Sequence, residues 1–470
     1  MTEFNLLAAA CESRSRASSA QRLLNLYPEQ APDQSVALYG TPGLSLYAEV
    51  GSGPIRGMIA EAGCIYLVSY NRVYKLSVPS PGTVATTLLG SITSTSGMVS
   101  LASNGTQIHL ADGTMDGYTI NIASNTLSII TDPDYPGGVT NTFADGFILV
   151  NAPNTGRVYS SEAYAADTYD GLKFLTSEGA PDNAVAILSD HREVWVLNTR
   201  TFEVLWNAGS SGMSFERIQG AFGEQGCAAA YSPQKIDNTV FWLGQDDKGR
   251  GVVWKAEGYT PRRVSTHEIE ARISTFPVIS DAVAWSYQQD GHTFYVLNFP
   301  SGDATFVYDA ATDKWHERGW FSNGVTHRHR GQCHVLFNGV HIVSDWENGK
   351  LYTMAPTHYS DNGDEICREI ITTHLRTGSR GFYGQLEVRL ESGQGLLSGQ
   401  GSDPQILLST SEDQGQTFGS WQARSMGRVG QYLQRAVWQR IGSGYSKTFR
   451  LRITDPIKVV LTGASVEVKK

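Results

Sequence analysis

Residues 290–308 read DGHTFYVLNFPSGDATFVY, and this stretch decides the fold. Its first two residues, Asp290-Gly291, tolerate the positive φ angles that a tight hairpin turn requires. Phe294–Leu297 and Phe306–Tyr308 are short runs of aromatic and β-branched residues, which favour strands. The stretch therefore predicts a tight turn followed by two short strands.

The same unit recurs along the chain at intervals of about 40 to 55 residues, the period expected for propeller blades. Its first strands are Ile65–Val68, Ile108–Leu110, Phe147–Val150, Val194–Leu197, Val240–Leu243, Phe294–Leu297 and Val340–Val343. Second strands are visible at Val73–Leu76, Val252–Trp254, Phe306–Tyr308 and Leu351–Met354, and further turn dipeptides are Asn104-Gly105, Asp145-Gly146 and Asn338-Gly339. A single blade cannot bury both of its faces, so neighbouring blades must stack around an axis. We predict a β-propeller of about six or seven blades over residues 51–356.

The rhythm ends at residues 357–366, where polarity rises, and strands of another style follow. Leu386, Val388 and Leu390 alternate with Glu387 and Arg389, as in a half-buried antiparallel sheet. Residues 357–470 therefore predict a second β module that resembles a sandwich. Residues 1–50 are expected to form an extended arm that adds edges or caps to other elements. The fold class is all-β, with one short helix expected at 269–273 after Ser265-Thr-His-Glu268, which resembles a capping box.

Composition limits the classes of function. Of 470 residues, 40% are hydrophobic and 18% charged, which excludes wholesale disorder, and 49 glycines with 21 tyrosines suit many short strands. The net charge is −9, whereas a protein that grips nucleic acid by neutralising phosphates is basic. We expect no tight DNA binding, although a weakly repulsive wall suits DNA that passes nearby.

The chain shows no sign of an oxidising compartment or of a membrane. Five scattered cysteines (Cys11, Cys64, Cys227, Cys333, Cys367) contain no CxxC pair, so we expect buried thiols rather than a zinc ribbon or a disulfide framework. Residues 1–20 lack the pattern of a signal peptide, and no run of about twenty apolar residues occurs.

One turn motif is shared with enzymes. Ser411-Glu-Asp413-Gln-Gly415-Gln-Thr417-Phe418 fits the Asp box of sialidases, in which the aspartate bonds turn amides and the glycine takes positive φ. The motif is a folding element, and a sialidase would also need clustered arginines and a tyrosine nucleophile. A single copy outside the propeller favours the structural interpretation.

Three further segments are candidate metal sites and are better explained otherwise. His327 and His329, in Thr326-His-Arg-His-Arg330, are two residues apart as on one strand face, but no third ligand can be named, and we expect a solvated loop or strand face. Asp361, Asp364 and Glu365 resemble parts of a calcium loop without its ligand order, which favours an acidic linker. Asp246-Asp-Lys-Gly-Arg250 is expected to be a hairpin tip.

No nucleophile elbow, phosphate-binding loop or HExxH helix occurs in the sequence. We therefore expect no catalytic residue, no metal site and no cofactor, and the chain is not predicted to be an enzyme.

Motifs along nearly the whole chain resemble the packaged-DNA stabilisation proteins, also called tail nozzle or tail hub proteins, of short-tailed phages of the P22 type. The resemblance begins with Arg22–Pro28, Leu38–Leu44 and Gly57–Leu76, and continues through Thr201–Trp206, Gly220–Ala229 and Val307–Ala310 ahead of Trp315. It ends with Leu408–Gly415, Val437–Gly442, Phe449–Thr454 and Val459–Val466, in the family's order.

The resemblance implies a structural protein of the virion tail, synthesised in the cytoplasm of a bacterial host. It implies a homo-oligomeric ring, a hexamer, below the portal and its adaptor. Such a ring closes the tail, retains packaged double-stranded DNA, forms the channel for DNA ejection and seats a tail needle or tailspikes. The family has no catalytic residues to transfer.

Two other classes of function stay open at this point. A glycan-binding or sialidase-like virion protein on a propeller predicts a monomer with clustered arginines and carboxylates in a concave site. A cellular propeller scaffold predicts a monomer that binds peptides and does not co-purify with virions. A ring, formed alone or on the portal–adaptor platform, is expected only of the tail nozzle.

Overall fold

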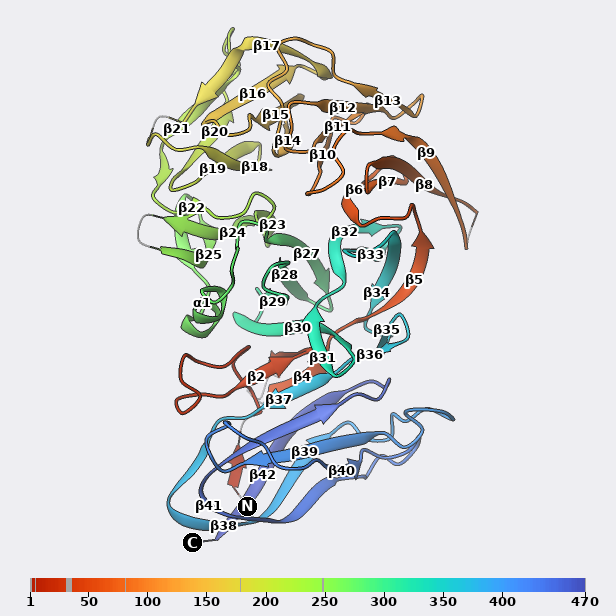
Figure 1. Cartoon of the computed structure of the whole chain (residues 1–470), viewed down its shortest axis with the longest axis vertical. Helices are drawn as coiled ribbons and strands as arrows, with labels where there is room; N and C mark the ends of the chain where they lie inside the picture. The colour runs from red at the N-terminus through yellow and green to blue at the C-terminus, as the bar shows by residue number, and fades with distance from the viewer. Residues whose placement is uncertain are drawn as a thin grey trace.

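The computed structural model describes residues 2–4, 6–30, 36–80, 82–177, 179–246 and 249–469. Regular structure in these residues is almost entirely β-strand, as the sequence predicts. Figure 1 shows a wheel of sheets and, below it, a second stack of sheets that holds both chain ends. The wheel is a β-propeller and the stack a β-sandwich.

Blades one to five follow the chain, and each is an antiparallel sheet that is separate from its neighbours. Blade one consists of β6 (Ile55–Glu61), β7 (Cys64–Ser69), β8 (Arg72–Ser80) and β9 (Thr83–Ser91). Blade two consists of β10 (Ser100–Ser103), β11 (Gln107–Ala111), β12 (Gly117–Asn121) and β13 (Thr126–Ile129). Blade three consists of β14 (Asn141–Ala144), β15 (Phe147–Asn151), β16 (Arg157–Glu162) and β17 (Ala165–Thr176). Blade four consists of β18 (Ala184–Asp190), β19 (Glu193–Asn198), β20 (Phe202–Asn207) and β21 (Phe215–Gly223). Blade five consists of β22 (Gly226–Cys227), β23 (Gln234–Ile236), β24 (Thr239–Asp246), β25 (Gly249–Glu257) and β26 (Thr260–Arg263).

Blades six and seven complete the wheel. Blade six consists of β27 (Val283–Gln289), β28 (His292–Phe299), β29 (Ala304–Asp309) and β30 (Lys314–Ser322), with β31 (Val325–Arg328) paired to β30. Blade seven consists of β32 (Gly331–Phe337), β33 (Val340–Asp345), β34 (Lys350–Ala355) and, from the N-terminal segment, β5 (Gly43–Glu49). The described strands thus make seven blades, within the predicted range. Because β32 contacts β6, blade seven lies beside blade one and the wheel is closed.

The core of the wheel lies between the blades, as expected for sheets that cannot bury both faces alone. Tyr66 and Val68 of blade one, for example, share one apolar cluster with Leu110 and Ile120 of blade two, and all four side chains are buried. Repetition of such contacts around the axis gives the propeller its stability.

Three of the four predicted turn dipeptides adopt positive φ at both residues: Asp145-Gly146 (47° and 94°), Asp290-Gly291 (51° and 83°) and Asn338-Gly339 (50° and 76°). Asn104-Gly105 differs, because only its glycine has positive φ. There the Asn104 side-chain oxygen accepts hydrogen bonds from the amides of Thr106 and Gln107. The asparagine side chain closes this turn together with its backbone amide, which donates to the carbonyl of Gln107 at 3.0 Å.

The sandwich has two sheets. One contains β1 (Thr2–Phe4), β3 (Leu26–Gln30), β4 (Val36–Gly40), β42 (Val460–Lys469), β38 (Leu375–Leu390) and the first part of β41 (Ala436–Ile453). The other contains the last part of β41, β37 (Arg368–Ile371), β2 (Arg22–Leu24), β39 (Gln405–Ser411) and β40 (Gln422–Ser425). Trp438, Tyr383 and Phe449 are fully buried in one apolar cluster together with Leu23 and Leu38 from the N-terminal segment.

As expected, the N-terminal segment adds strands to the edges of other sheets, but residues 1–50 are divided between the two domains instead of forming one arm. Strands β1 to β4 belong to the sandwich, whereas β5 is the outer strand of blade seven, with Leu44 paired to Met354. At the other boundary, β35 (Ser360–Asp361) pairs with β5 and with β36 (Asp364–Glu365), so the segment 357–366 continues the sheet of blade seven. An N-terminal strand that completes the last blade ties the two ends of the wheel together, and no local sequence pattern indicates this pairing.

The short helix exists, but its cap lies one residue later than the sequence predicts. Helix α1 runs from His267 to Ile273, and its N-cap is Thr266, whose hydroxyl accepts a hydrogen bond from the amide of Ile269. The hydroxyl of Ser265 instead lies 2.6 Å from a carboxylate oxygen of Glu270. In the part of the chain that the structure describes, no helix is long and apolar enough to cross a bilayer.

Candidate functional site

Strand β2 is the place where propeller and sandwich join. Leu24 pairs in parallel with Glu317 of β30, and Arg22–Leu24 pair antiparallel with Glu369–Ile371 of β37. The sheet of blade six therefore continues through β2 and β37 into β41 of the sandwich. Main-chain hydrogen bonds, rather than a linker alone, connect the two domains.

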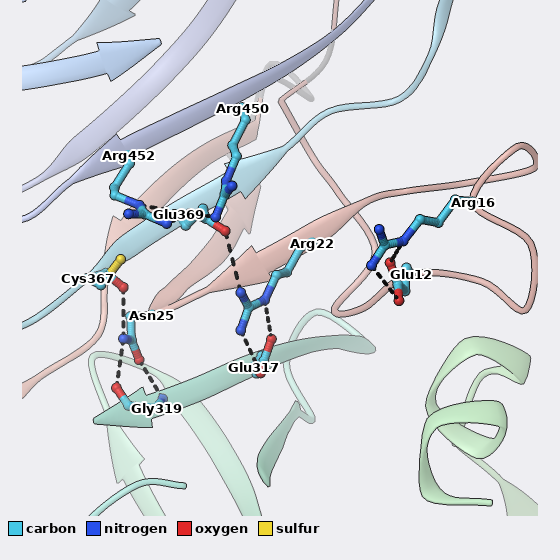
Figure 2. A network of polar contacts seen from close by, with 10 residues as sticks. All are labelled: Glu12, Arg16, Arg22, Asn25, Glu317, Gly319, Cys367, Glu369, Arg450 and Arg452. Atoms are coloured by element: carbon cyan, nitrogen blue, oxygen red, sulfur yellow. Dashed lines mark hydrogen bonds and ion pairs between the residues drawn. The ribbon is translucent and has the colours of Figure 1, made fainter. Parts of the chain in front are cut away.

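Arg22 reinforces this junction with hydrogen bonds to two carboxylates (Figure 2). Its Nε and Nη2 donate to the two carboxylate oxygens of Glu317 at 2.6 and 2.9 Å, and its Nη1 donates to Glu369 Oε1 at 3.4 Å. Two parallel bonds between a guanidinium and a carboxylate fix orientation as well as distance. Arg22 therefore binds a propeller carboxylate and a sandwich carboxylate at once.

Glu369 is the centre of the network. Its side chain is 1% exposed, and it accepts hydrogen bonds from Arg452 Nε at 2.9 Å and Nη2 at 2.7 Å, with Arg450 Nη2 at 2.8 Å. Burial by itself raises the pKa of the Glu369 carboxyl, but Arg450, Arg22 and Arg452 lower it by more, so that its pKa lies below the ordinary value. The buried carboxylate is therefore charged, and its three arginines hold it in place.

Asn25 provides a second bridge, just after β2. Its Nδ2 donates to the carbonyls of Gly319 and Cys367, both at 2.9 Å, and its Oδ1 accepts from the amide of Gly319 at 2.9 Å (Figure 2). Asn25 has a φ of 53°, a conformation that asparagine tolerates better than most residues. At Gly319 a Cβ atom would lie 2.4 Å from Thr326 Cγ2, so glycine lets the strands approach closely.

A cleft of about 620 Å³ lies beside the network, lined among others by Cys11, Arg22, Arg272, Glu317 and Arg450. Burial, the largest cause, raises the pKa of the Cys11 thiol to about 12, so this cysteine is not a nucleophile at neutral pH. The carboxylates of Glu317 and Glu369 are occupied by arginines. The ion pairs at this site therefore hold the propeller and the sandwich together.

The axis of the propeller is bridged by Tyr231, which lies between β22 and β23 of blade five. Its hydroxyl lies 3.1 Å from the carbonyl oxygen of Met98 and 3.0 Å from that of Val139, which precede the first strands of blades two and three. At the same end, Arg56 of blade one donates to the carbonyls of Tyr70, Ser94 and Gly97. The Tyr231 contacts join blade five to blades two and three across the wheel, whereas the Arg56 contacts join blade one to the segment that leads into blade two.

The segment Thr326–Arg330 is not a solvated face. His327 Nδ1 lies 2.8 Å from Asp303 Oδ2 near the surface, whereas His329 is buried. Burial, followed by Arg318 and Arg330, lowers the pKa of His329 to about 3. The strand ends at Arg328, so the two histidines do not share a strand face. In the described residues, no three His, Cys, Asp or Glu side chains are placed to hold a metal ion.

The acidic segment 361–365 is also not an ordinary linker. Asp361 is buried, and that burial raises its pKa to about 7 although Arg368 and Arg330 lower it. Asp364 accepts a hydrogen bond from Trp320 Nε1 at 2.8 Å. The segment is fixed because it pairs with β5 and packs against cationic side chains of both domains.

The Asp box forms the predicted turn, at the end of β39 in the sandwich. Asp413 accepts hydrogen bonds from the amide and hydroxyl of Thr417, at 2.9 and 2.5 Å, and from Ser411 Oγ at 2.7 Å. These bonds, with that of the Thr417 hydroxyl the largest cause, lower the pKa of Asp413 to about 2. Gly415 has a φ of 81°, as the motif requires, and Arg450 lies 5.5 Å from the ring centre of Phe418. The motif is a folding element here.

Two remaining predictions are resolved in part. Of Asp246–Arg250, residues 247 and 248 lie outside the described residues, and Asp246 pairs with Gly249 across β24 and β25. The five cysteines are free thiols, four of them buried and Cys333 half-buried.

Sequence reasoning missed the junction residues, although they carry a signal. Arg450 and Arg452 alternate with apolar residues in Phe449-Arg-Leu-Arg-Ile453, which predicts one charged face. The sequence does not show which residues these arginines bind. Arg22, Glu317 and Glu369 are far apart in the sequence, and no local pattern relates them.

Comparisons with known proteins match both domains. A family model described as Bacteriophage P22 Gp10, beta-propeller, matches residues 16–359, and one described as Bacteriophage P22 Gp10, beta-sandwich, matches residues 367–469. No curated protein matches the sequence significantly. Among solved structures, the chain is similar to the WD40 beta propeller domain of Doa1 (11% identity, TM-score 0.42, 67% of this chain and 97% of that one). It is also similar to the computationally designed Ika8 protein (13% identity, TM-score 0.40, 74% of this chain and 98% of that one).

Proposed function

The chain belongs to the bacteriophage P22 Gp10 family and is a structural protein of the virion tail of a P22-like phage, and from this premise we propose that it is the tail nozzle. Copies of the chain form a ring, a hexamer, below the portal and adaptor. The ring closes the tail, retains the packaged DNA and lines the channel through which the DNA is ejected.

The observation that carries the proposal is the match of both domains in order. The propeller model covers residues 16–359 and the sandwich model 367–469, which together span most of the chain. A propeller alone occurs with many functions, so the fold by itself carries little weight. Here both domains of one family match, each over its own part of the chain and in order.

The junction supports a mechanical role. Strand β2 continues blade six into the sandwich, and Arg22 binds Glu317 and Glu369 together. A subunit whose two domains share a sheet behaves as one rigid block. Such blocks form a closed ring when one heterologous contact repeats through a closing rotation.

The axis of the propeller favours a DNA path between copies rather than through one copy. Tyr231 of blade five bonds backbone carbonyls at the start of blades two and three, across the wheel. A channel shared by several copies is therefore the path consistent with this subunit. With a net charge of −9 per chain, the wall repels a polyanion weakly, so that DNA slides without tight binding.

The partners in this proposal are further copies of the chain, the portal–adaptor complex above the ring, and a tail needle or tailspikes attached to it. The ring acts as a plug until ejection and as a conduit afterwards.

The experiment combines native mass measurement with a test of DNA retention. The purified chain is weighed alone and after mixing with the portal–adaptor complex, and particles lacking it are compared with particles to which it is added back. We expect a closed oligomer, at least on the portal–adaptor platform, and nuclease-protected DNA only in the completed particles. A monomer under both conditions, with DNA retained equally well without it, would overturn the proposal.

A further inference from the structure

One part of the propeller rim carries no charge. No Asp, Glu, Lys or Arg occurs between Lys75 and Asp112, a stretch that includes the whole of β9, and none occurs between Asp116 and Asp132, which includes β13. For a chain in which 18% of residues are charged, these are long uncharged segments.

Strands β9 and β13 are the outer strands of blades one and two and lie next to each other (Figure 1). A Cβ at Gly90 of β9 would lie 2.9 Å from Leu127 Cδ2 of β13, which shows how closely the two edges approach. Lys75 Nζ donates to Asn125 Oδ1 at 2.8 Å and joins blade one to the turn before β13. The two edges therefore form one continuous surface, which we call the uncharged rim.

The uncharged rim exposes apolar side chains. Leu88 is 52% exposed on β9 and Ile129 is 48% exposed on β13, and Thr86 and Thr87 beside Leu88 are exposed as well. Strand β9 is nine residues long and ends its sheet, so one row of its amides and carbonyls has no strand partner within the described chain.

Other outer strands are protected in the ways that natural proteins use. Strand β17 carries Asp167, Asp170 and Lys173, while β21 and β26 also carry charged residues. Strand β30 is covered by β2, and β5 by β35. Long, uncharged, exposed edges tend to pair with another chain. The unprotected edge of β9 therefore indicates that a binding partner covers the uncharged rim.

We propose that the uncharged rim is the surface through which one copy of this chain contacts the next copy in the ring, an inference that rests on the proposed function. Copies that each carry a charge of −9 repel one another, and a region without charge lets them approach at the lowest electrostatic cost. The free edge of β9 offers main-chain hydrogen bonds to the neighbour, and Leu88 and Ile129 supply apolar contact. The occupant is a second copy.

The test is a pair of charge insertions, Leu88→Glu and Ile129→Glu, combined in one variant. Both side chains are exposed in the single chain, so the melting temperature is expected to stay within a few degrees of the parent. Each copy–copy contact, however, gains two carboxylates that lose their water when the copies meet, which weakens the contact. The matched control is Leu172→Glu on β17, an outer strand of blade three where the leucine is 85% exposed among charged neighbours. Oligomer mass is measured on the portal–adaptor complex by native mass spectrometry.

We expect the parent and the Leu172→Glu variant to form rings and the double variant to stay monomeric. Rings of equal stability in all three proteins would overturn the inference and leave the nozzle proposal standing. Rings of the double variant that form but no longer attach to the adaptor would assign the rim to the adaptor and also overturn it. If the parent itself never forms a ring, the proposed function fails, and the inference with it.

A labelling experiment keeps the test decisive if the double variant misfolds. A cysteine replacing exposed Thr87 is treated with a bulky maleimide, with Thr168→Cys on β17 as the control, in a chain whose own cysteines are buried or half-buried. Assembly is expected to slow labelling at position 87 at least tenfold and to leave position 168 unchanged. Equal labelling of both positions in the ring would contradict the proposed contact.

Discussion

Arg22 of strand β2 and Glu317 of blade six, 295 residues apart in the sequence, form a two-point ion pair with distances of 2.6 and 2.9 Å. The pair lies where β2 continues the sheet of blade six, so a strand from the start of the chain is held between two domains that the chain builds later. Forces applied to one domain are therefore passed to the other through a sheet. This arrangement suits the proposed nozzle, in which the subunit keeps its shape under the pressure of packaged DNA.

The first prediction concerns the carboxylate at the centre of the junction. Glu369→Gln removes one buried charge and leaves Arg22, Arg450 and Arg452 close together without it. Breaking a buried ion pair in this way typically costs about 3–5 kcal/mol, and we expect a loss of this size in the free energy of unfolding. Urea unfolding followed by tryptophan fluorescence measures it.

The control for Glu369 is Glu12→Gln, which removes the carboxylate from the exposed pair between Glu12 and Arg16. Exposed pairs of this kind contribute less than about 1 kcal/mol, so this variant is expected to unfold at nearly the urea concentration of the parent. Equal midpoints for the Glu369 and Glu12 variants would show that the junction does not depend on the buried charge.

The second prediction concerns the pH dependence of stability. Burial raises the pKa of Asp361 to about 7 in the folded chain, from 3.8 when the group is unperturbed. Between these two values the folded state binds a proton that the unfolded state has lost, so this group makes the free energy of unfolding fall as pH rises. Asp361→Asn removes this contribution.

Relative to the parent, the Asp361→Asn variant is expected to gain stability from pH 4 to pH 8, by up to about 4 kcal/mol for a shift of this size. Urea midpoints of both proteins at the two pH values check the sign. Asp290→Asn, in the exposed turn before β28, is the control and should track the parent at both pH values. A parent–variant difference that is the same at pH 4 and pH 8 would refute the assignment.

The local parts of the fold were predictable because their signals are local. Asp290-Gly291 and the strands around Phe294 and Phe306 lie within one hairpin, and the structure places them as predicted. The repeat of such hairpins then gives the propeller, and the change of strand pattern after residue 366 gives the sandwich.

The parts that sequence reasoning missed depend on contacts between distant segments. Strand β5 closes blade seven from about 300 residues away, and β2 pairs with β30 and β37 across both domains. The charged sequence neighbours of His329 predict a solvated side chain, yet it is buried against Trp285 by packing that no local pattern encodes. The candidate site was missed for the same reason, since each of its ion pairs joins residues that are far apart.

The third prediction concerns the axis of the propeller. Tyr231→Phe keeps the half-buried ring but removes the hydroxyl that bonds the carbonyls of Met98 and Val139. A typical intramolecular hydrogen bond contributes about 0.5–1.5 kcal/mol to stability, so we expect a lower melting temperature. The matched control is Tyr259→Phe, whose hydroxyl bonds Glu193 at the surface and whose loss should cost less. If the Tyr259 variant is the less stable of the two, the bridge across the axis does not stabilise the propeller.

The fourth prediction tests the turns on which the propeller pattern rests. Gly339 has a φ of 76°, and a Cβ atom at this position would meet nothing within 4 Å, so Gly339→Ala changes backbone strain without creating a clash. An alanine held at positive φ is destabilising by about 1–2 kcal/mol. Gly212 also has open space around it, but its φ is not positive, and Gly212→Ala is therefore the matched control. We expect thermal unfolding to show a lower melting temperature for the Gly339 variant and an unchanged one for the Gly212 variant. Equal melting temperatures would mean that the tight turn before β33 relaxes to another conformation, and that positive φ at this dipeptide does not hold blade seven in register.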